Sequence, residues 1–324
     1  MSHGDHPTFL LNIFGNVGYT TAPAPGDHSG FDIGPFDLYA TTRLSDHWSA
    51  LGELVFENDN NELSTDLERF LVAWEPASAL RLRVGREHSP LVRWNTALHH
   101  GLYMQTPVER PAMARFEDDN GPWPVHFVGV LVSGGLPNGV SYGAGAGNGR
   151  GSSREEVQVS FDRNGSKAYV AWLGFAPAAV IGWELFATGH AETIPAPTGP
   201  LRERDLTFAT NYLAHGVELR AEWGRMNHKP VGSGITYKTT GWYVLLGLGL
   251  RGGLESLKPY VLLDSLKVAR EEAYLAGIPD RSAWSAGLRW DPNGKTAVKG
   301  EYVSQKIGSD PRDSLFRSQI ALSF

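Results

Sequence analysis

Apolar and polar residues that alternate with a period of two constrain this chain more than any other feature. The last eleven residues read SLFRSQIALSF. Phe316, Ile320 and Phe324 fall on one face of this segment, and Arg317 and Gln319 fall on the other. A period of two is typical of a β-strand with one apolar face. The same pattern recurs along the chain without a convincing amphipathic helix, so we expect an all-β protein.

Sixteen such segments can be counted, as one strand, seven hairpins and one closing strand. The predicted strands span residues 9–19, 36–44, 47–57, 66–76, 79–87, 126–136, 139–147, 167–177, 181–190, 204–213, 216–226, 240–250, 257–266, 282–292, 295–305 and 314–324. An even count places both termini on the same side of a closed barrel, and short turns alternate with longer connections as in outer-membrane barrels. If the segment EEVQVSF (155–161) is a further strand with a partner, the count becomes eighteen.

The distribution of side chains between the inward and outward faces of the strands favours a membrane barrel over a soluble β-sandwich. Charged residues on the inward faces would be costly in the core of a sandwich. Aromatic residues gather on the outward faces near strand ends, as in the girdles of membrane barrels: Trp48, Trp74, Trp183, Trp223, Trp242, Trp284, Trp290 and Tyr302. We therefore predict a single domain over residues 1–324, a transmembrane antiparallel up-and-down β-barrel in contact with outer-membrane lipid.

Composition excludes several classes of function. The net charge is −6, which argues against a nucleic-acid partner. The chain has no cysteine, so disulfides, thiolate metal sites and cysteine nucleophiles are excluded. The start MSHGDHPTF lacks the basic and apolar parts of a signal peptide, and we expect the numbering to begin near a mature amino terminus.

Inward positions of the predicted strands carry as many acids as bases. The acids expected to line the pore are Asp37, Glu53, Glu57, Glu218, Glu222 and Glu301. The bases are Arg43, Arg81, Arg83, Arg220, Arg289 and Lys299. Opposite charges screen one another within about 8 Å at physiological salt. Six acids against six bases therefore predict a lumen with weak ion selectivity.

The alternation stops between residues 88 and 123, and this is the longest segment without strand character. Long structureless segments usually carry function or fold inside another element. We expect it to be the third outer loop, folded into the lumen as a constriction loop. Its candidate residues are Arg86, Arg93, His99, His100, Arg110, Arg115, Glu117 and Asp118. The alternative is that its arginines and carboxylates only attach the loop to the wall.

No metal, cofactor or catalytic site is expected. His99 and His100 are adjacent in sequence and so point apart, and no third ligand is spaced near them. The sequence Glu203-Arg204-Asp205 is interpreted as a set of solvated charges at the edge of a loop.

Several segments resemble the phosphate-selective porin family in its broad sense. They are FDLYATTRLSDHWSALGELVFE, DLERFLVAWEP with LRLRVGREHSP, WNTALHHGLYMQTPVERP, FEDDNGPWPVHFVGV and GNGRG. The resemblance implies a sixteen-stranded barrel in a bacterial outer membrane, often a homotrimer, that passes small hydrophilic solutes or ions. It does not imply a phosphate site, because this chain lacks the rows of Arg and Lys that line such channels.

Three functions are considered. The first is a porin for passive diffusion through a charge-balanced lumen. The second is a structural barrel that sheathes or anchors a protein partner. The third is an outer-membrane lipid hydrolase, for which His88-Ser89, Asn95 and His99 lie in one loop without the spacing of a triad.

Overall fold

A computed structural model describes residues 8–22, 28–59, 62–98, 101–117, 119–154, 162 and 165–324. Nearly all the regular structure is β. The strands are β1 (Thr8–Thr20), β2 (Gly30–Ile33), β3 (Phe36–Arg43), β4 (Trp48–Asp59), β5 (Glu62–Ala77), β6 (Leu80–His88), β7 (His126–Gly135), β8 (Val140–Asn148), β9 (Lys167–Phe175), β10 (Trp183–Ile194), β11 (Leu201–Ala214), β12 (Val217–Pro230), β13 (Tyr237–Leu248), β14 (Leu257–Lys267), β15 (Arg281–Asn293), β16 (Thr296–Ile307) and β17 (Asp313–Ser323). Two short helices, α1 (Arg93–Leu98) and η1 (Ala112–Ala114), lie between β6 and β7.

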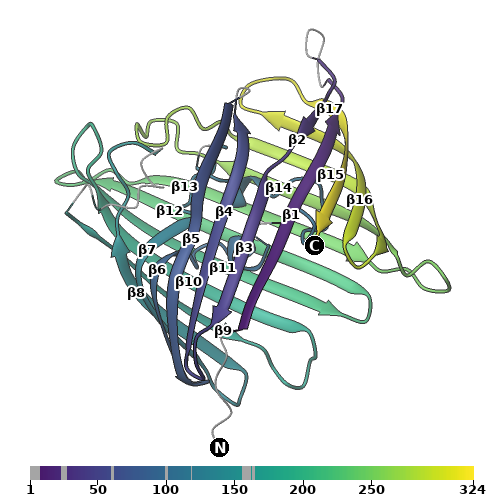
Figure 1. The fold of residues 1–324 in the computed structure, drawn as a ribbon. Coiled ribbons are helices and arrows are strands. Elements are labelled where there is room, and N and C mark those ends of the chain that lie inside the picture. The colour runs from purple at the N-terminus through teal and green to yellow at the C-terminus, as the bar shows by residue number, and fades with distance from the viewer. Residues whose placement is uncertain are drawn as a thin grey trace, which may run out of the picture.

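The sheet closes into a barrel through its first and last strands (Figure 1). β1 pairs antiparallel with β17, from Phe14 opposite Ser323 to Thr20 opposite Arg317. From β3 onward, each strand pairs antiparallel with the next strand along the chain. Closure leaves no open edge that could pair with another chain. The predicted role of the carboxyl-terminal strand, to close the barrel against the first strand, is confirmed.

The short strand β2 does not add a position to the barrel. β2 and β3 pair with the same edge of β1, with Val17 opposite Ile33 and Phe14 opposite Asp37. The seventeen strands therefore occupy sixteen positions, as the sequence predicts. The alternative of eighteen does not hold, because β8 and β9 pair directly with each other. Residues 155–161, on which that alternative rested, lie outside the described residues.

Tight turns join strands at one end of the barrel. Between β11 and β12 the two central turn residues, His215 and Gly216, have φ of 55° and 79°. Positive φ at both central residues matches the right-handed twist of a two-residue hairpin. The predicted turn at Ala214-His215-Gly216 is therefore confirmed, and this end carries the short connections.

The outer face of the barrel is apolar. Trp48 and Trp74 lie opposite each other on β4 and β5, with ring centroids 6.4 Å apart, and Trp183 and Trp290 also lie near the short turns. Exposed side chains such as Leu173 continue this face between the strand ends. In the part of the chain that is described, no helix is long and apolar enough to cross a membrane.

The main hydrophobic core lies inside the barrel, between the wall and the segment that joins β6 to β7. Trp94, Met113 and Trp123 of this segment are almost fully buried against the inner faces of β12, β13 and β14. Two glycines opposite each other in the wall, Gly224 and Gly241, make room for them. A Cβ at Gly241 would lie 2.8 Å from Met113 Cβ and 3.0 Å from Trp123 Cζ3. Because glycine has no side chain, the wall leaves room for the loop here, and a larger residue would displace the loop.

Candidate functional site

The segment from residue 89 to 125, called the inner loop below, folds into the lumen. Its helix α1 starts against Glu222 of β12, whose carboxylate accepts hydrogen bonds from Arg93 N at 2.8 Å and Trp94 N at 3.4 Å. Tyr243 donates its hydroxyl to the same carboxylate at 3.1 Å. An acceptor at the first amides of a helix satisfies donors that have no partner within the helix. The wall therefore caps this helix.

Three further wall carboxylates bind the inner loop in the same way. Glu218 accepts from the hydroxyl of Thr106 at 2.6 Å. Glu301 accepts from Val108 N at 3.3 Å. Asp264 accepts from Ala112 N at 3.2 Å. Buried amides without secondary structure need such acceptors, and charged acceptors form strong hydrogen bonds.

Two wall bases bind carbonyl groups of the inner loop. Arg289 donates to Tyr103 O at 2.6 Å and to Gln105 O at 2.9 Å. Lys299 donates to Leu102 O and, at 3.2 Å, to Pro107 O. Wall acids thus accept hydrogen bonds from amide groups of the inner loop, and wall bases donate hydrogen bonds to its carbonyl groups.

These contacts change the meaning of the predicted pore-lining set. Glu218, Glu222, Arg289, Lys299 and Glu301 face inward, but each is at most 7% exposed. The inner loop covers them, so they do not border the open part of the lumen. Sequence alternation identifies the inward face but not the path of a loop across it.

Ion pairs attach the side chains of the inner loop as well. Glu109 lies 2.7 Å from Arg317, 2.9 Å from Arg115 and 3.9 Å from Arg281. Burial opposes ionisation of Glu109, but the three guanidinium groups hold its pKa below the ordinary value. Arg93 pairs with Glu184 of β10 at 2.8 Å. The alternative in which arginine–carboxylate pairs attach the loop to the wall thus fits Arg93, whereas the ion-pair partners of Arg115, Glu109 and Asp119, belong to the loop itself.

Two sizeable hollows of the lumen, lined by described residues, lie on the side of β1, β3, β4 and β5. The lower hollow, nearer the short turns, has a volume of about 380 Å³, and its lining includes Tyr39, Glu53, Arg69 and Met104. The upper hollow, nearer the long connections, has a volume of about 270 Å³. Its charged lining residues are Asp32, Asp37, Glu57, Glu109, Arg110, Asp119 and Arg317.

Phe14 of β1 lines both hollows. On the opposite side stands Gly101 of the inner loop, with a positive φ of 68°. A Cβ at Gly101 would lie 2.7 Å from Phe14 Cδ1, so the loop backbone touches the phenyl ring. Positive φ is unfavourable for most side chains. This contact between loop and wall is therefore built from a ring and a glycine.

Carboxylates predominate around the two hollows. The lining has six carboxylates, from Glu53 and from the five acids of the upper hollow, against three guanidinium groups, Arg69, Arg110 and Arg317. The balance predicted from sequence mixed these residues with others that the inner loop covers. Folding separates the two groups. The group that lines the hollows has a negative formal charge, and Glu53 and Asp37 within it are themselves 0% and 2% exposed.

Arg69 is a lining residue that is missing from the predicted set. β5 contains one more residue than β4 at this point, because Glu53 pairs with Arg69 and Leu54 pairs with Leu67. The extra residue, Glu68, makes a β-bulge, which re-aims the side chains that follow it. Arg69 consequently reaches Glu53 across the lumen face, where the two form an ion pair.

The other predicted residues occupy peripheral places. Arg43 binds Asp46 in a turn, and Arg81 pairs with Glu75 at 3.3 Å, so both lie at the rim near the short turns. Arg83 pairs with Glu87 along β6.

Three predicted loop residues and one wall residue serve local contacts. Arg86 donates to Glu68 O at 3.0 Å, Arg220 donates to Glu218 at 2.8 Å, and Glu117 accepts from Val125 N at 2.7 Å. Arg110 lies over the ring of Phe116, 4.0 Å from its centroid. His99, His100 and Asp118 lie outside the described residues.

The residues considered for hydrolysis are placed in the wall and loop interior. Ser89 and Asn95 are 2% and 1% exposed, and His88 is 6% exposed. Ser89 Oγ accepts a hydrogen bond from Leu91 N at 3.4 Å. His99 lies outside the described residues. This hydrogen bond between Leu91 N and Ser89 Oγ stabilises the start of the inner loop.

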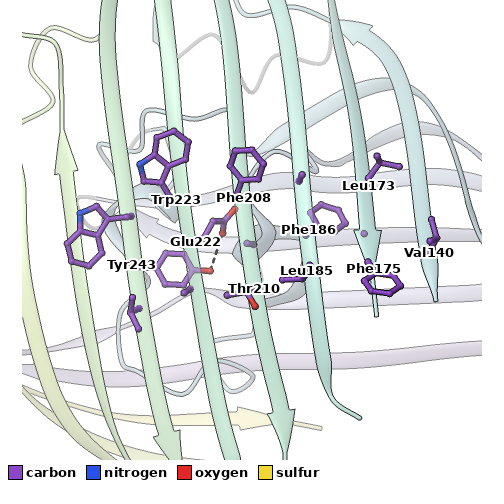
Figure 2. A pocket seen from close by; sticks show the side chains of 16 residues that line it. Val140, Leu173, Phe175, Leu185, Phe186, Phe208, Thr210, Glu222, Trp223 and Tyr243 are labelled. Carbon is purple, nitrogen blue, oxygen red and sulfur yellow. Dashed lines mark hydrogen bonds between the residues drawn. The ribbon is translucent and has the colours of Figure 1, made fainter. Parts of the chain in front are cut away.

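Another hollow, of about 670 Å³, lies on the outer face (Figure 2). Phe208, Trp223 and Leu173 line it together with the exposed Trp242. The hydrogen bond drawn in Figure 2, between Glu222 and Tyr243, belongs to the inner face of the same strands. Such a surface suits contact with lipid tails and offers nothing to a hydrophilic solute.

No family model matches the sequence, and no curated protein matches it. Solved structures do match in fold. The anion-selective porin from Comamonas acidovorans has a TM-score of 0.71 and 13% identity, over 98% of this chain and 100% of that chain. Salmonella typhi OmpF, in complex with daunomycin, has a TM-score of 0.70 and 12% identity, over 98% and 97%. OmpT with loop L8 deleted, an outer membrane protein of Vibrio cholerae, has a TM-score of 0.67 and 10% identity, over 99% and 100%. The fold of this chain is therefore that of a porin-like β-barrel.

Proposed function

We propose that this protein is a passive diffusion channel of a bacterial outer membrane for small hydrophilic solutes or ions. The observation that carries the proposal is the inner loop. Wall side chains hold it inside the lumen, and it leaves two polar hollows that both reach Phe14. A narrow polar passage selects solutes by width and by the charges along it.

The alternatives have less support from the geometry. A plug protein would need the space that the inner loop already occupies, and hollows of about 270 and 380 Å³ suit small molecules. A hydrolase would need a nucleophile open to substrate, whereas Ser89 is 2% exposed. Kinship with the phosphate-selective porin family in the broad sense, contact with outer-membrane lipid and assembly as a homotrimer belong to the same proposal.

We further propose that the passage prefers cations. Six carboxylates against three guanidinium groups line the hollows, and fields are strong inside a narrow, partly desolvated space. The Comamonas neighbour is described as anion-selective. The negative lining of this chain favours ions of the opposite sign.

Conductance in planar bilayers tests the proposed channel directly. Purified, folded protein is expected to produce discrete current steps that persist without any partner protein. Membranes that show only leak current after insertion, verified by protease protection of the barrel, would contradict the proposal.

Phe14→Ala is expected to raise single-channel conductance. The substitution removes the ring that meets Gly101 between the two hollows, so the contact between wall and loop opens. The matched control is Phe9→Ala on the same strand, where the ring is 65% exposed on the outer face. Equal conductance in the two variants would remove Phe14 from the constriction.

Asp32→Lys is expected to shift the reversal potential in a salt gradient toward anion preference. Asp32 lines the upper hollow, and the substitution replaces one negative charge of this lining by a positive charge. Glu255→Lys is the control, because it makes the same change of charge in the turn between β13 and β14. A shift of the same size in both variants would mean that net charge, and not the lining, sets selectivity.

A further inference from the structure

We propose that the inner face of β10, β11 and β12 holds a divalent metal ion of the zinc type. The ligands are His190 of β10 together with Glu203 and Asp205 of β11. The site lies apart from the two hollows, on the opposite wall, and does not depend on the proposed channel function. The sequence predicted no metal site, and interpreted Glu203 and Asp205 as solvated loop charges.

Strand register brings these residues together. His190 lies opposite Asp205, and Glu192 lies opposite Glu203. On the other side of β11, Glu203 lies opposite His228 of β12. Residues two apart on a strand share a face, and those opposite one another on neighbouring strands are about 5 Å apart. The interpretation of Glu203 and Asp205 as loop charges is wrong, because β11 begins at Leu201 and both side chains point into the barrel at 0% and 5% exposure.

The geometry suits a small divalent cation. His190 Nδ1 lies 2.8 Å from Asp205 Oδ2 and 3.4 Å from Glu203 Oε1. One ligand atom of each residue lies within 4.8 Å of the others. A zinc ion with bonds of about 2.0–2.2 Å in tetrahedral geometry needs ligand atoms separated by roughly 3.3–3.6 Å. The separation of His190 Nδ1 and Glu203 Oε1 already lies in that range, whereas Asp205 Oδ2 would have to move about 0.5 Å away from His190 Nδ1.

Two buried oxygens favour a ligand here. Asp205 Oδ1 has no hydrogen-bond partner among the described residues, and Glu203 Oε1 has only ion-pair contacts of 3.4 Å to His190 and 3.6 Å to Arg150. A buried carboxylate oxygen without a partner is costly, and a cation removes that cost. Imidazole and carboxylate together form a donor set typical of zinc and its neighbours.

The surrounding residues are arranged as supports for such ligands. The second nitrogen of His190, Nε2, lies 3.7 Å from Glu192 Oε1. The second oxygen of Glu203, Oε2, lies 2.6 Å from His228 Nε2. His228 Nδ1 in turn lies 3.3 Å from Glu272 Oε2. Metal-bound histidines and carboxylates usually have partners of this kind, which fix their orientation.

Formal charge also leaves room for a divalent ion. Arg150 lies 3.6 Å from both Glu192 Oε1 and Glu203 Oε1. The carboxylates of Glu192, Glu203, Asp205 and Glu272 contribute −4 and Arg150 contributes +1, which gives −3 when His190 and His228 are neutral. A divalent cation offsets two of these negative charges.

A second group in the described chain, Glu68 with His88 and His126, also brings one ligand atom each within 4.8 Å. We do not extend the proposal to it. It supplies a useful competitor in the test below.

The test is metal binding to folded, chelator-treated protein in detergent micelles. All variants carry His3→Ala and His6→Ala, so that amino-terminal histidines do not contribute. Calorimetric titration with Zn²⁺ is expected to show one ion per chain, and Co²⁺ is expected to give the visible absorption of a low-coordinate site. His190→Ala and Glu203→Gln are expected to abolish both signals. Glu192→Gln, which keeps the ligands and removes a support, is expected to weaken binding about 10–100-fold.

His47→Ala and His126→Ala are the matched controls. His47 is in an exposed turn, and His126 belongs to the competing group. Both controls are expected to bind as the parent does. Absent binding in the parent, or binding that survives His190→Ala but is lost in His126→Ala, would overturn the proposal. Because Glu192→Gln leaves all three ligands in place, it keeps the test decisive if His190→Ala fails to fold.

Discussion

Replacing Arg289 and Lys299 together by alanine is expected to release the middle of the inner loop and to raise single-channel conductance with added current noise. The two side chains donate to the carbonyls of Leu102, Tyr103, Gln105 and Pro107. Each hydrogen bond with a charged donor contributes about 1.5–3 kcal/mol. The free energy lost with these hydrogen bonds is larger than the stabilisation that the irregular segment 101–110 keeps from its hydrogen bonds to Glu218 and Glu301.

The control for this double variant is Arg312→Ala with Lys306→Ala. It removes the same charge from the end with long connections, where Arg312 donates to Ser304 O and to Ser282 Oγ. Conductance and the rate of proteolytic cleavage within the inner loop are the two measurements. If Arg289→Ala/Lys299→Ala leaves both at the level of the control, the inner loop is held by its apolar contacts alone.

Trp123→Ala is expected to cause the largest loss of stability of any single substitution in the inner loop. Trp123 is fully buried, and its ring lies over the paired glycines Gly224 and Gly241. Truncating a buried tryptophan costs about 3–5 kcal/mol, because transfer energy is lost and a cavity remains. The flat glycine surface beneath cannot move to fill that cavity.

The measurement is the temperature at which the folded band disappears in a heated-gel assay. Trp242→Ala is the matched control, since Trp242 lies next to Gly241 on the same strand but is 41% exposed on the outer face. Trp123→Ala is expected to unfold at the lower temperature of the two. An equal or larger loss in Trp242→Ala would show that the lipid-facing rings, and not the loop core, limit stability.

The barrel could be predicted from sequence because its determinants are local. Alternation within a strand fixes which side chains face inward, and turn residues such as Gly216 fix where strands reverse. The sixteen positions follow from these patterns. The interruption of one strand into β2 and β3 and the bulge at Glu68 escaped prediction, because each inserts residues without breaking the apolar pattern.

The site was less predictable because it depends on contacts between distant segments. Glu222 and Asp37 look alike in sequence, as inward acids on amphipathic strands. The inner loop covers Glu222, whereas Asp37 lines a hollow. The path of the loop decides this, and the glycines at 224 and 241 are a local sign of it. The cluster around His190 likewise depends on register between strands.

The attachment of the inner loop through its main chain has an evolutionary consequence. Four wall carboxylates and two wall bases bind mostly peptide groups, which every residue type carries. Loop side chains that face the passage without an ion pair to the wall, such as Met104, can therefore change without loss of this anchoring. Mutation can alter the width and charge of the passage while the anchoring stays intact. A single barrel can therefore acquire new permeants through a series of variants that all still fold.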